Sequence, residues 1–136
     1  MAKVLFLDDD KTRLDTFVKC TGADVVWCKD RAQFVDRLTN GDVYDLIMLD
    51  HDLGLPDFDG SDAAKWLSEN LLTTGDGGTQ LVVIHSANIV GASNMYHRMK
   101  SSDHLEVYVI AFAWMRCRTN PRTGDIQFGY PEEFED

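Results

Sequence analysis

Short apolar runs alternate along the chain with segments whose apolar residues recur every three or four positions. Five apolar runs have the length and composition of buried strands, namely residues 4–7, 25–28, 45–49, 81–84 and 105–110. Segments with helical spacing separate these runs, namely residues 11–20, 30–38, 61–71 and a short one around 95–99. Strands that alternate with helices in this way predict an α/β fold with a parallel sheet.

Polar residues and glycines mark the ends of the predicted helices. Asp10 and Asp30 stand where a helix N-cap is expected, and Asp8 is an alternative cap for the first helix. Ser61 or Asp62 is expected to cap the third helix. A Gly-rich turn is expected over residues 73–79, before the fourth apolar run.

The alternation stops after residue 110. Residues 111–118 have no helical period, residues 120–125 are rich in turn formers, and residues 126–128 alternate like a strand. We expect a β-hairpin over residues 113–130 that extends the fifth strand and replaces a fifth helix. The acidic stretch 131–136 is expected to fray.

Length and charge narrow the class of protein. A chain of 136 residues with 44% apolar residues fits one domain, residues 1–136, with a core over 3–112. The net charge of -10 argues against a nucleic-acid backbone or an anionic membrane as partner. The same charge could equally serve only to keep the protein in solution.

Cysteine usage and hydropathy indicate a cytoplasmic setting. Cys20, Cys28 and Cys117 form no C-x-x-C pair, and their odd number suits reduced thiols better than a disulfide framework. No stretch is long and apolar enough to span a bilayer. Residues 1–3 lead directly into a strand without a secretory pattern.

Polar clusters follow three of the predicted strands. Residues 8–10 are Asp-Asp-Asp, residues 50–52 are Asp-His-Asp, and residues 85–88 are His-Ser-Ala-Asn. In an open parallel sheet the carboxyl ends of the strands line the ligand crevice, so these clusters should meet. Carboxylates that meet repel one another unless a cation lies among them. Oxygen ligands favour Mg²⁺ or Mn²⁺, with Asp9 and Asp50 as ligands and Asp8 or Asp52 completing the site.

The remaining polar residues suit phosphate chemistry. His85 and His51 can act as general acid or base because histidine titrates near neutral pH. Ser86 and Asn88 can donate hydrogen bonds to phosphate oxygens. Purely structural roles stay open: His51 could bond a loop carbonyl, His85 could be a satisfied core residue, and Ser86 could be a turn residue.

The order and spacing of these residues resemble the receiver domain of two-component response regulators, over residues 3 to about 112. The resemblance implies that Asp8 and Asp9 help to bind magnesium and that Asp50 is the phosphoacceptor. It also implies that a backbone carbonyl at Asp52 completes the metal shell and that Ser86 contacts the phosphoryl group. The implied fold is a doubly wound, five-stranded parallel sheet of the receiver or flavodoxin type, with strand order 2-1-3-4-5.

The chain also departs from ordinary receivers. The Asp-Gly pair at 59–60 resembles the one that opens their third helix, but the lysine that ends their fifth strand is missing near Ala111. Arg116 is the next cation and is expected to lie too far along the hairpin. The motifs L-D-H-D-L at residues 49–53 and H-S-x-N at residues 85–88 resemble a receiver-like group of bacteria and phages. That group has been proposed to process cyclic phosphates.

Two other phosphate-processing families fit less well. Residues 8–12 match the D-x-D-x-T start of haloacid-dehalogenase-type phosphatases, but the chain lacks their C-terminal lysine and acidic pair. The His-Asp pair at 51–52 matches metal-dependent HD phosphohydrolases, which place it on a helix.

Three functions remain open from the sequence. The first, which we favour, is a metal-dependent enzyme with Asp50, His85, His51 and Ser86 in catalytic roles, acting on a phosphoester such as a cyclic phosphate. The second is a stand-alone receiver that takes a phosphoryl group from a phosphodonor on Asp50 and signals to a protein partner. The third is a pseudo-receiver that only binds. The expected small-molecule partner carries a phosphate group.

Overall fold

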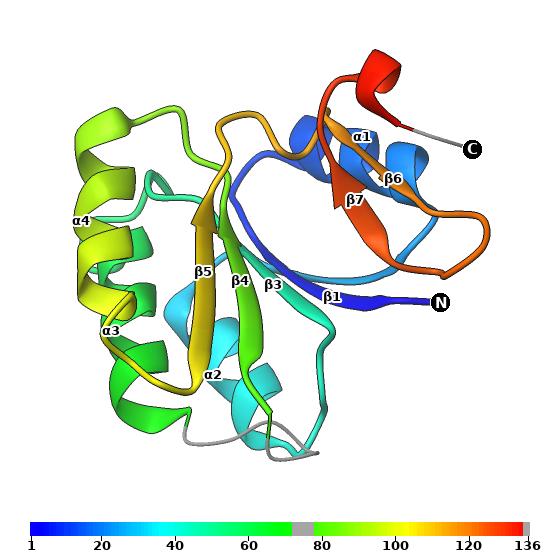
Figure 1. Ribbon diagram of the computed structural model, residues 1–136. Helices are drawn as coiled ribbons and strands as arrows, with labels where there is room; N and C mark the ends of the chain where they lie inside the picture. Colours follow the sequence, from blue (N-terminus) through cyan, green and yellow to red (C-terminus); the bar gives the residue numbers. More distant parts are fainter. Residues whose placement is uncertain (72–77, 135–136) are drawn as a thin grey trace.

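One parallel sheet organises the molecule. The computed structural model describes residues 1–71 and 78–134. Five strands lie in the order β2-β1-β3-β4-β5, and all neighbouring pairs are parallel (Figure 1). They are β1 (Lys3–Leu7), β2 (Asp24–Cys28), β3 (Leu46–Leu49), β4 (Gln80–Ile84) and β5 (Leu105–Val109). The predicted doubly wound receiver topology is confirmed.

Helices cover both faces of this sheet (Figure 1). In the described part of the chain they are α1 (Lys11–Thr21), α2 (Arg31–Thr39), α3 (Gly60–Asn70), α4 (Ile89–Met99) and the 3-10 helix η1 (Pro131–Glu133). Phe34 of α2, Leu67 of α3 and Met95 of α4 pack on one face, whereas Phe17 of α1 packs on the other. This division places α1 and the loop before it beside the carboxyl end of β1.

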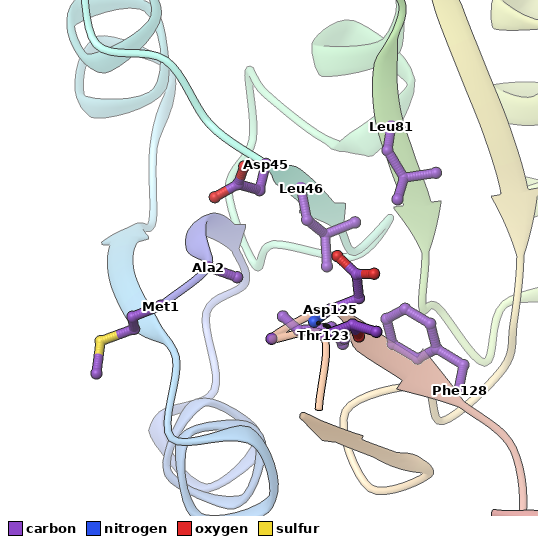
Figure 2. A pocket seen from close by; sticks show the side chains of 10 residues that line it. Met1, Ala2, Asp45, Leu46, Leu81, Thr123, Asp125 and Phe128 are labelled. Carbon is purple, nitrogen blue, oxygen red and sulfur yellow. Dashed lines mark hydrogen bonds between the residues drawn. The ribbon is translucent and has the colours of Figure 1, made fainter. Parts of the chain in front are cut away.

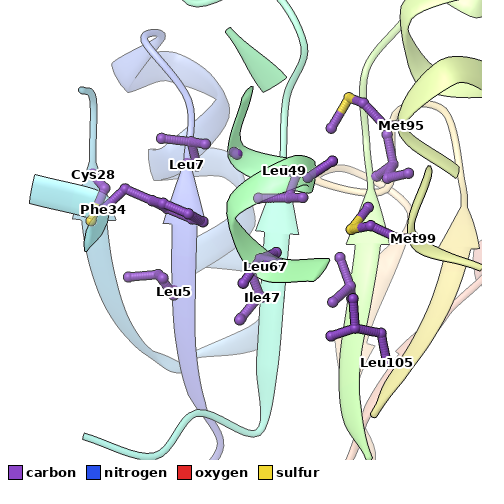
Figure 3. Packing of buried hydrophobic residues seen from close by; sticks show 14 of the residues in the cluster. Leu5, Leu7, Cys28, Phe34, Ile47, Leu49, Leu67, Met95, Met99 and Leu105 are labelled. Atoms are coloured by element: carbon purple, nitrogen blue, oxygen red, sulfur yellow. The ribbon is translucent and has the colours of Figure 1, made fainter. Parts of the chain in front are cut away.

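The strands have apolar residues at successive positions because both of their faces are buried. In β1, Leu5 and Leu7 belong to the core on the side of α2, α3 and α4, shown in Figure 3. Val4 and Phe6 point to the opposite side and pack with Phe17. All of these side chains are completely buried, so the sheet holds the ends of its strands in fixed positions.

The C-terminal segment forms the predicted hairpin but not in the predicted place. Strands β6 (Cys117–Thr119) and β7 (Ile126–Phe128) pair antiparallel as a separate two-stranded sheet. The expectation that the hairpin extends the fifth strand is therefore wrong. A turn over residues 111–115 carries the chain away from β5 to the α1 face, where Cys117 is buried in the same core cluster as Phe17. The hydroxyl of Thr119 donates to the carbonyl of Thr21 at the end of α1.

Capping explains most of the helix boundaries. Asp10 caps α1 and Asp30 caps α2, as predicted. The predicted cap of the third helix is wrong, because Asp59 is the N-cap and Asp62 closes a capping box on it. Only glycine fits at the first position of α3, because a Cβ on Gly60 would lie 2.3 Å from the backbone oxygen of Asp50.

Two further expectations concern regions described only in part. The predicted turn over residues 73–79 lies mostly outside the described residues, as do residues 135–136 of the acidic stretch. Within the part of the chain that the structure describes, no helix combines the length and apolar character required to cross a membrane. All three cysteines are free thiols.

Candidate functional site

Three carboxylates meet at the carboxyl edge of the sheet. Asp8 and Asp9 follow β1, and Asp50 follows β3, which pairs directly with β1. Each of the three offers an oxygen within 4.8 Å of the others. Asp8 and Asp50 are buried, whereas Asp9 is exposed. The convergence expected from the topology is therefore present.

Asp8 is saturated with hydrogen bonds inside the protein. Its Oδ1 accepts from the backbone N–H of Asp10 (2.9 Å) and from Nη2 of Arg13 (2.8 Å). Its Oδ2 accepts from Nε of Arg13 and is bonded to Nε2 of His85, both at 2.9 Å. Burial alone would raise the pKa of Asp8, but the bonds from His85 and Arg13 outweigh burial and lower it to about 2. A carboxylate offers about four acceptor positions, so Asp8 acts as an ionised anchor.

The pKa values of Asp9 and Asp50 are shifted in the opposite direction from that of Asp8. Desolvation, which is only partial for the exposed Asp9, raises the pKa of both carboxyl groups, and the negative charge of Asp8 raises it further. Their contacts with Arg13 Nη2 are long, 3.3 Å from Asp9 Oδ1 and 3.4 Å from Asp50 Oδ2. Arg13 is the cation that contacts these carboxylates and also Asp10, so the group keeps an excess of negative charge that a divalent cation would reduce. These oxygens therefore fit a hard divalent metal.

Arg13 is the member of the site that the sequence analysis missed. It lies in the first turn of α1, where the Asp10 cap fixes the backbone, and its guanidinium forks onto Asp8. The hydrogen bonds with Asp8 are the main reason why its pKa is raised. An arginine in the first helical turn after an acidic strand end is the sequence signal that would have marked it as a candidate.

A pocket of about 160 Å³ opens beside the carboxylates. Residues from four segments line it, namely Arg13, Asp50, Asp52, His85, Ser86, Ala87, Asn88, Phe112 and Trp114. This volume is below the roughly 300–1,000 Å³ of common ligand pockets. It suits a phosphate group with an ion better than a whole organic ligand.

His85 is held deep in the wall of this pocket. Its side chain is completely buried and stacks on Phe6, with ring centroids 4.9 Å apart and planes 21° apart. Nε2 must carry a proton to donate to the ionised carboxylate of Asp8, which fixes that end of the ring. Nδ1 is buried and has no hydrogen-bond partner among the described residues. Nδ1 is therefore the ring nitrogen whose hydrogen-bonding capacity is unused among the described residues.

His51 and Asp52 form a second polar group next to the pocket. His51 Nδ1 lies 2.8 Å from Asp52 Oδ1, and its Nε2 lies 3.8 Å from Asp59 at the start of α3. The ring packs on the first turn of α4, where a Cβ on Gly91 would lie 2.5 Å from ring carbons. His51 is not among the residues that line the pocket, whereas Asp52 is. The Asp52 carboxylate contacts His51 and Asn88 and lies outside the cluster of three carboxylates.

Ser86 and Asn88 line the pocket and also shape the loop that leads into α4. Ser86 Oγ accepts from the backbone N–H of Asn88 at 3.0 Å, as in a turn. Asn88 Oδ1 caps α4 by accepting from Gly91 N at 2.9 Å. The Ser86 hydroxyl proton and the Asn88 amide, which is 3.4 Å from Asp52, are still able to donate to an anion.

The segment after β5 supplies aromatic side chains to the pocket. Phe112 and Trp114 line it, with ring centroids 6.3 Å apart. Phe112 has a φ of 59°, and it is the only non-glycine residue in the described part of the chain with a positive φ. Arg116 lies over the rings of Tyr130 (4.5 Å) and Phe112 (6.0 Å) and does not line the pocket.

A larger cavity, of about 330 Å³, lies between the hairpin and the amino end of the sheet, away from the carboxylates (Figure 2). Leu46 and Leu81, near the amino ends of β3 and β4, line it together with Asp125 and Phe128 of the hairpin region. It contains none of the residues predicted for the site.

Comparison with known proteins agrees with this arrangement. The family model described as "Cyclic-phosphate processing Receiver domain" matches residues 3–101. The receiver domain of the Francisella response regulator 1452 is 27% identical with a TM-score of 0.55, over 79% of this chain and 84% of that chain. The N-terminal domain of a response regulator/sensory box/GGDEF 3-domain protein from Carboxydothermus hydrogenoformans shares the fold, with 23% identity and a TM-score of 0.56. That match covers 79% of each chain.

Among curated proteins no match was found. The family model nevertheless spans most of the chain and includes the ends of β1, β3 and β4, where the three carboxylates and His85 lie. The chain therefore belongs to the family of cyclic-phosphate processing receiver domains.

Proposed function

We propose that this receiver-like domain is a divalent-metal-dependent enzyme that acts on a phosphoester, with cyclic phosphates among its substrates. The observation that carries the proposal is the composition of one small pocket. On the β3 side, Asp50, whose pKa is raised, lines the pocket next to the carboxylate cluster, and on the β4 side Ser86 and Asn88 supply donors suited to phosphate oxygens. A metal ion and a phosphate group complement these two sides.

Asp9 and Asp50 are the side chains best placed to hold Mg²⁺ or Mn²⁺. Their carboxylates have only long contacts with a cation. Both oxygens of Asp8, in contrast, are already hydrogen-bonded to Arg13, His85 and a backbone N–H. A bound ion would neutralise the carboxylates and polarise a phosphoryl oxygen. We assign Asp8 to the orientation of its neighbours, and for Asp52 we keep the backbone carbonyl as the candidate ligand.

Proton transfer falls to His85 in this proposal. Hydrolysis of a cyclic phosphodiester breaks one P–O bond of the ring and forms one P–O bond to water. The water gives up a proton, and the leaving oxygen takes one up, so the products contain one added water. Nδ1 of His85 is the buried, unpartnered nitrogen that can accept or return that proton. His51 acts indirectly in this proposal. It contacts the carboxylate of Asp52, and its ring packs on Gly91 in the first turn of α4.

A stand-alone phosphoacceptor is the second candidate. Asp50 follows β3 and lines the same pocket as Ser86, which supports phosphorylation of Asp50 as an alternative. A pseudo-receiver that only binds a phosphate-containing molecule or a protein is the third. The three candidates share the pocket and differ in what happens to the phosphorus atom.

Phosphorus NMR separates these candidates. The protein is incubated with Mg²⁺ or Mn²⁺ and, in turn, with cyclic phosphodiesters, linear phosphodiesters and acetyl phosphate, with EDTA as control. Metal-dependent conversion of a diester to a monoester is the expected result. Acid-labile phosphorylation of Asp50 with all diesters intact would favour the receiver. No labelling and no conversion would leave a binding module and refute the enzyme.

A further inference from the structure

The pocket contains a cation that no motif assigns. Arg13 is the only lysine or arginine among the described residues that line it. Asp8 holds its guanidinium by two hydrogen bonds of 2.8 and 2.9 Å. Since Asp8 is completely buried and ionised, this anchor fixes the guanidinium plane at the edge of the pocket.

The remaining contacts of Arg13 are loose. Nη2 reaches Asp9 and Asp50 at 3.3 and 3.4 Å, and Nη1 lies 3.4 Å from Asp10. These distances are longer than those of strong charge-assisted bonds, about 2.7–2.9 Å. A metal ion on Asp9 and Asp50 could therefore replace the loose contacts and leave the anchor to Asp8 intact. The freed N–H groups would then be available to a ligand.

We infer that Arg13 is the phosphate-binding cation of this pocket. A guanidinium binds phosphate through two parallel N–H···O bonds, which a fixed plane favours. Arg13 would hold a phosphate oxygen from the side of α1, opposite Ser86 and Asn88 of the β4–α4 loop. It would thus provide from the first helix a positive charge that the segment after β5 does not supply, since Arg116 stacks on Tyr130. This inference shares one element with the proposed function, which is that phosphate binds in this pocket. It does not require that the protein be an enzyme.

The inference predicts opposite effects on two affinities. In an Arg13→Gln variant, inorganic phosphate in the presence of saturating Mg²⁺ should bind roughly ten- to a hundredfold more weakly, because a charge-assisted donor is lost. The affinity for Mn²⁺ alone should rise, because a positive charge leaves the carboxylate cluster. A loss of structure would instead weaken both, so the opposite signs exclude a merely structural role.

The experiment measures phosphate binding by ³¹P NMR titration and free Mn²⁺ by electron paramagnetic resonance. Lys11→Gln is the matched control, since it removes the same charge from an exposed position of α1 and should change neither affinity appreciably. Arg13→Lys keeps the charge but not the fork, so its phosphate affinity should lie between those of the native protein and Arg13→Gln. This variant also keeps a cation beside Asp8, should the glutamine variant fail to fold.

Several outcomes would overturn the inference. They are the absence of phosphate binding by the native protein at millimolar concentration, equal phosphate affinity in Arg13→Gln, and a parallel fall in both affinities. Diester turnover by the native protein is measured separately. Arg13-dependent phosphate binding without turnover would refute the proposed enzyme and support the role of Arg13. Turnover that is unaffected by Arg13→Gln would support the enzyme and refute the role of Arg13.

Discussion

Nε2 of His85 lies 2.9 Å from Oδ2 of Asp8, and both side chains are completely buried. The bond joins the ends of β4 and β1, which are not neighbours in the sheet. Because Arg13 uses the same carboxylate, one ionised group holds a histidine and an arginine at the edge of one pocket. Asp8 is therefore the residue on which the arrangement of the site depends.

Replacing Asp8 by Asn should destabilise the protein by about 2–4 kcal/mol, because the guanidinium of Arg13 loses its closest counter-ion and buried His85 loses its anionic partner. Urea unfolding measures this change. Asp15→Asn, which breaks an exposed ion pair with Lys11 on the same helix, should cost less than about 1 kcal/mol. Equal stabilities of the two variants would show that Asp8 is not the anchor.

Replacing His85 by Ala should lower the rate of phosphoester hydrolysis roughly a hundredfold or more, because a general acid or base is lost. The affinity for Mn²⁺ should change little, since His85 does not belong to the carboxylate cluster. Rate and Mn²⁺ affinity are measured on the same preparation, with the melting temperature as a check on folding. An unchanged rate in a folded variant would remove His85 from the mechanism.

Tyr44 should make the protein sensitive to alkali. Burial is the main cause that raises its pKa to about 12 in the folded protein, above the value near 10 of an exposed tyrosine. The neutral form is favoured on folding, so its contribution is complete below pH 10 and is lost as the pH rises toward 12. The loss amounts to about 2–3 kcal/mol.

The comparison that tests this is the stability of native protein and Tyr44→Phe at pH 8 and pH 11. Tyr44→Phe should lose less stability between the two pH values, because it has no phenol to ionise. Tyr130→Phe removes an exposed phenol and should behave like the native protein. An identical loss in native protein and Tyr44→Phe would contradict the assignment.

The backbone of Phe112 predicts an unusual order of stabilities. At φ 59° a side chain with a Cβ is strained, and glycine is not. Phe112→Ala and Phe112→Gly lose the same ring, so the glycine variant should be more stable by roughly 1 kcal/mol, although glycine is usually the less stabilising residue. Thermal unfolding measures the difference, and a more stable alanine variant would argue against a left-handed conformation.

Much of the fold could be predicted because its signals are local. Apolar runs identified the strands of a sheet buried on both faces, and Asp10 and Asp30 marked the N-caps of two helices. The cap of α3 was misplaced because glycine is a poor helix former, whereas Gly60 is required in the first turn by its close approach to the Asp50 backbone, which is a tertiary contact. The position of the hairpin likewise depends on which core cluster buries Cys117.

The site was predictable where topology alone decides it. Asp8, Asp9 and Asp50 stand at ends of paired strands, so their meeting followed from strand order. Arg13 could not be ranked above the other cations of its helix without the direction of its side chain. The position of His51 also depends on the direction of its side chain. Its ring packs on Gly91 and does not line the pocket.

We propose that the carboxylate cluster supports metal-dependent cleavage of a phosphoester. The most direct test follows the ³¹P resonance of a cyclic phosphodiester with Mg²⁺ or Mn²⁺ and equal amounts of native protein or Asp50→Asn. Native protein should convert the diester to a monoester, and EDTA should stop the conversion. Asp50→Asn should bind Mn²⁺ more weakly and convert the diester far more slowly, because a charged ligand is lost. An intact diester with native protein, or conversion that is unaffected by EDTA and by Asp50→Asn, would contradict the claim.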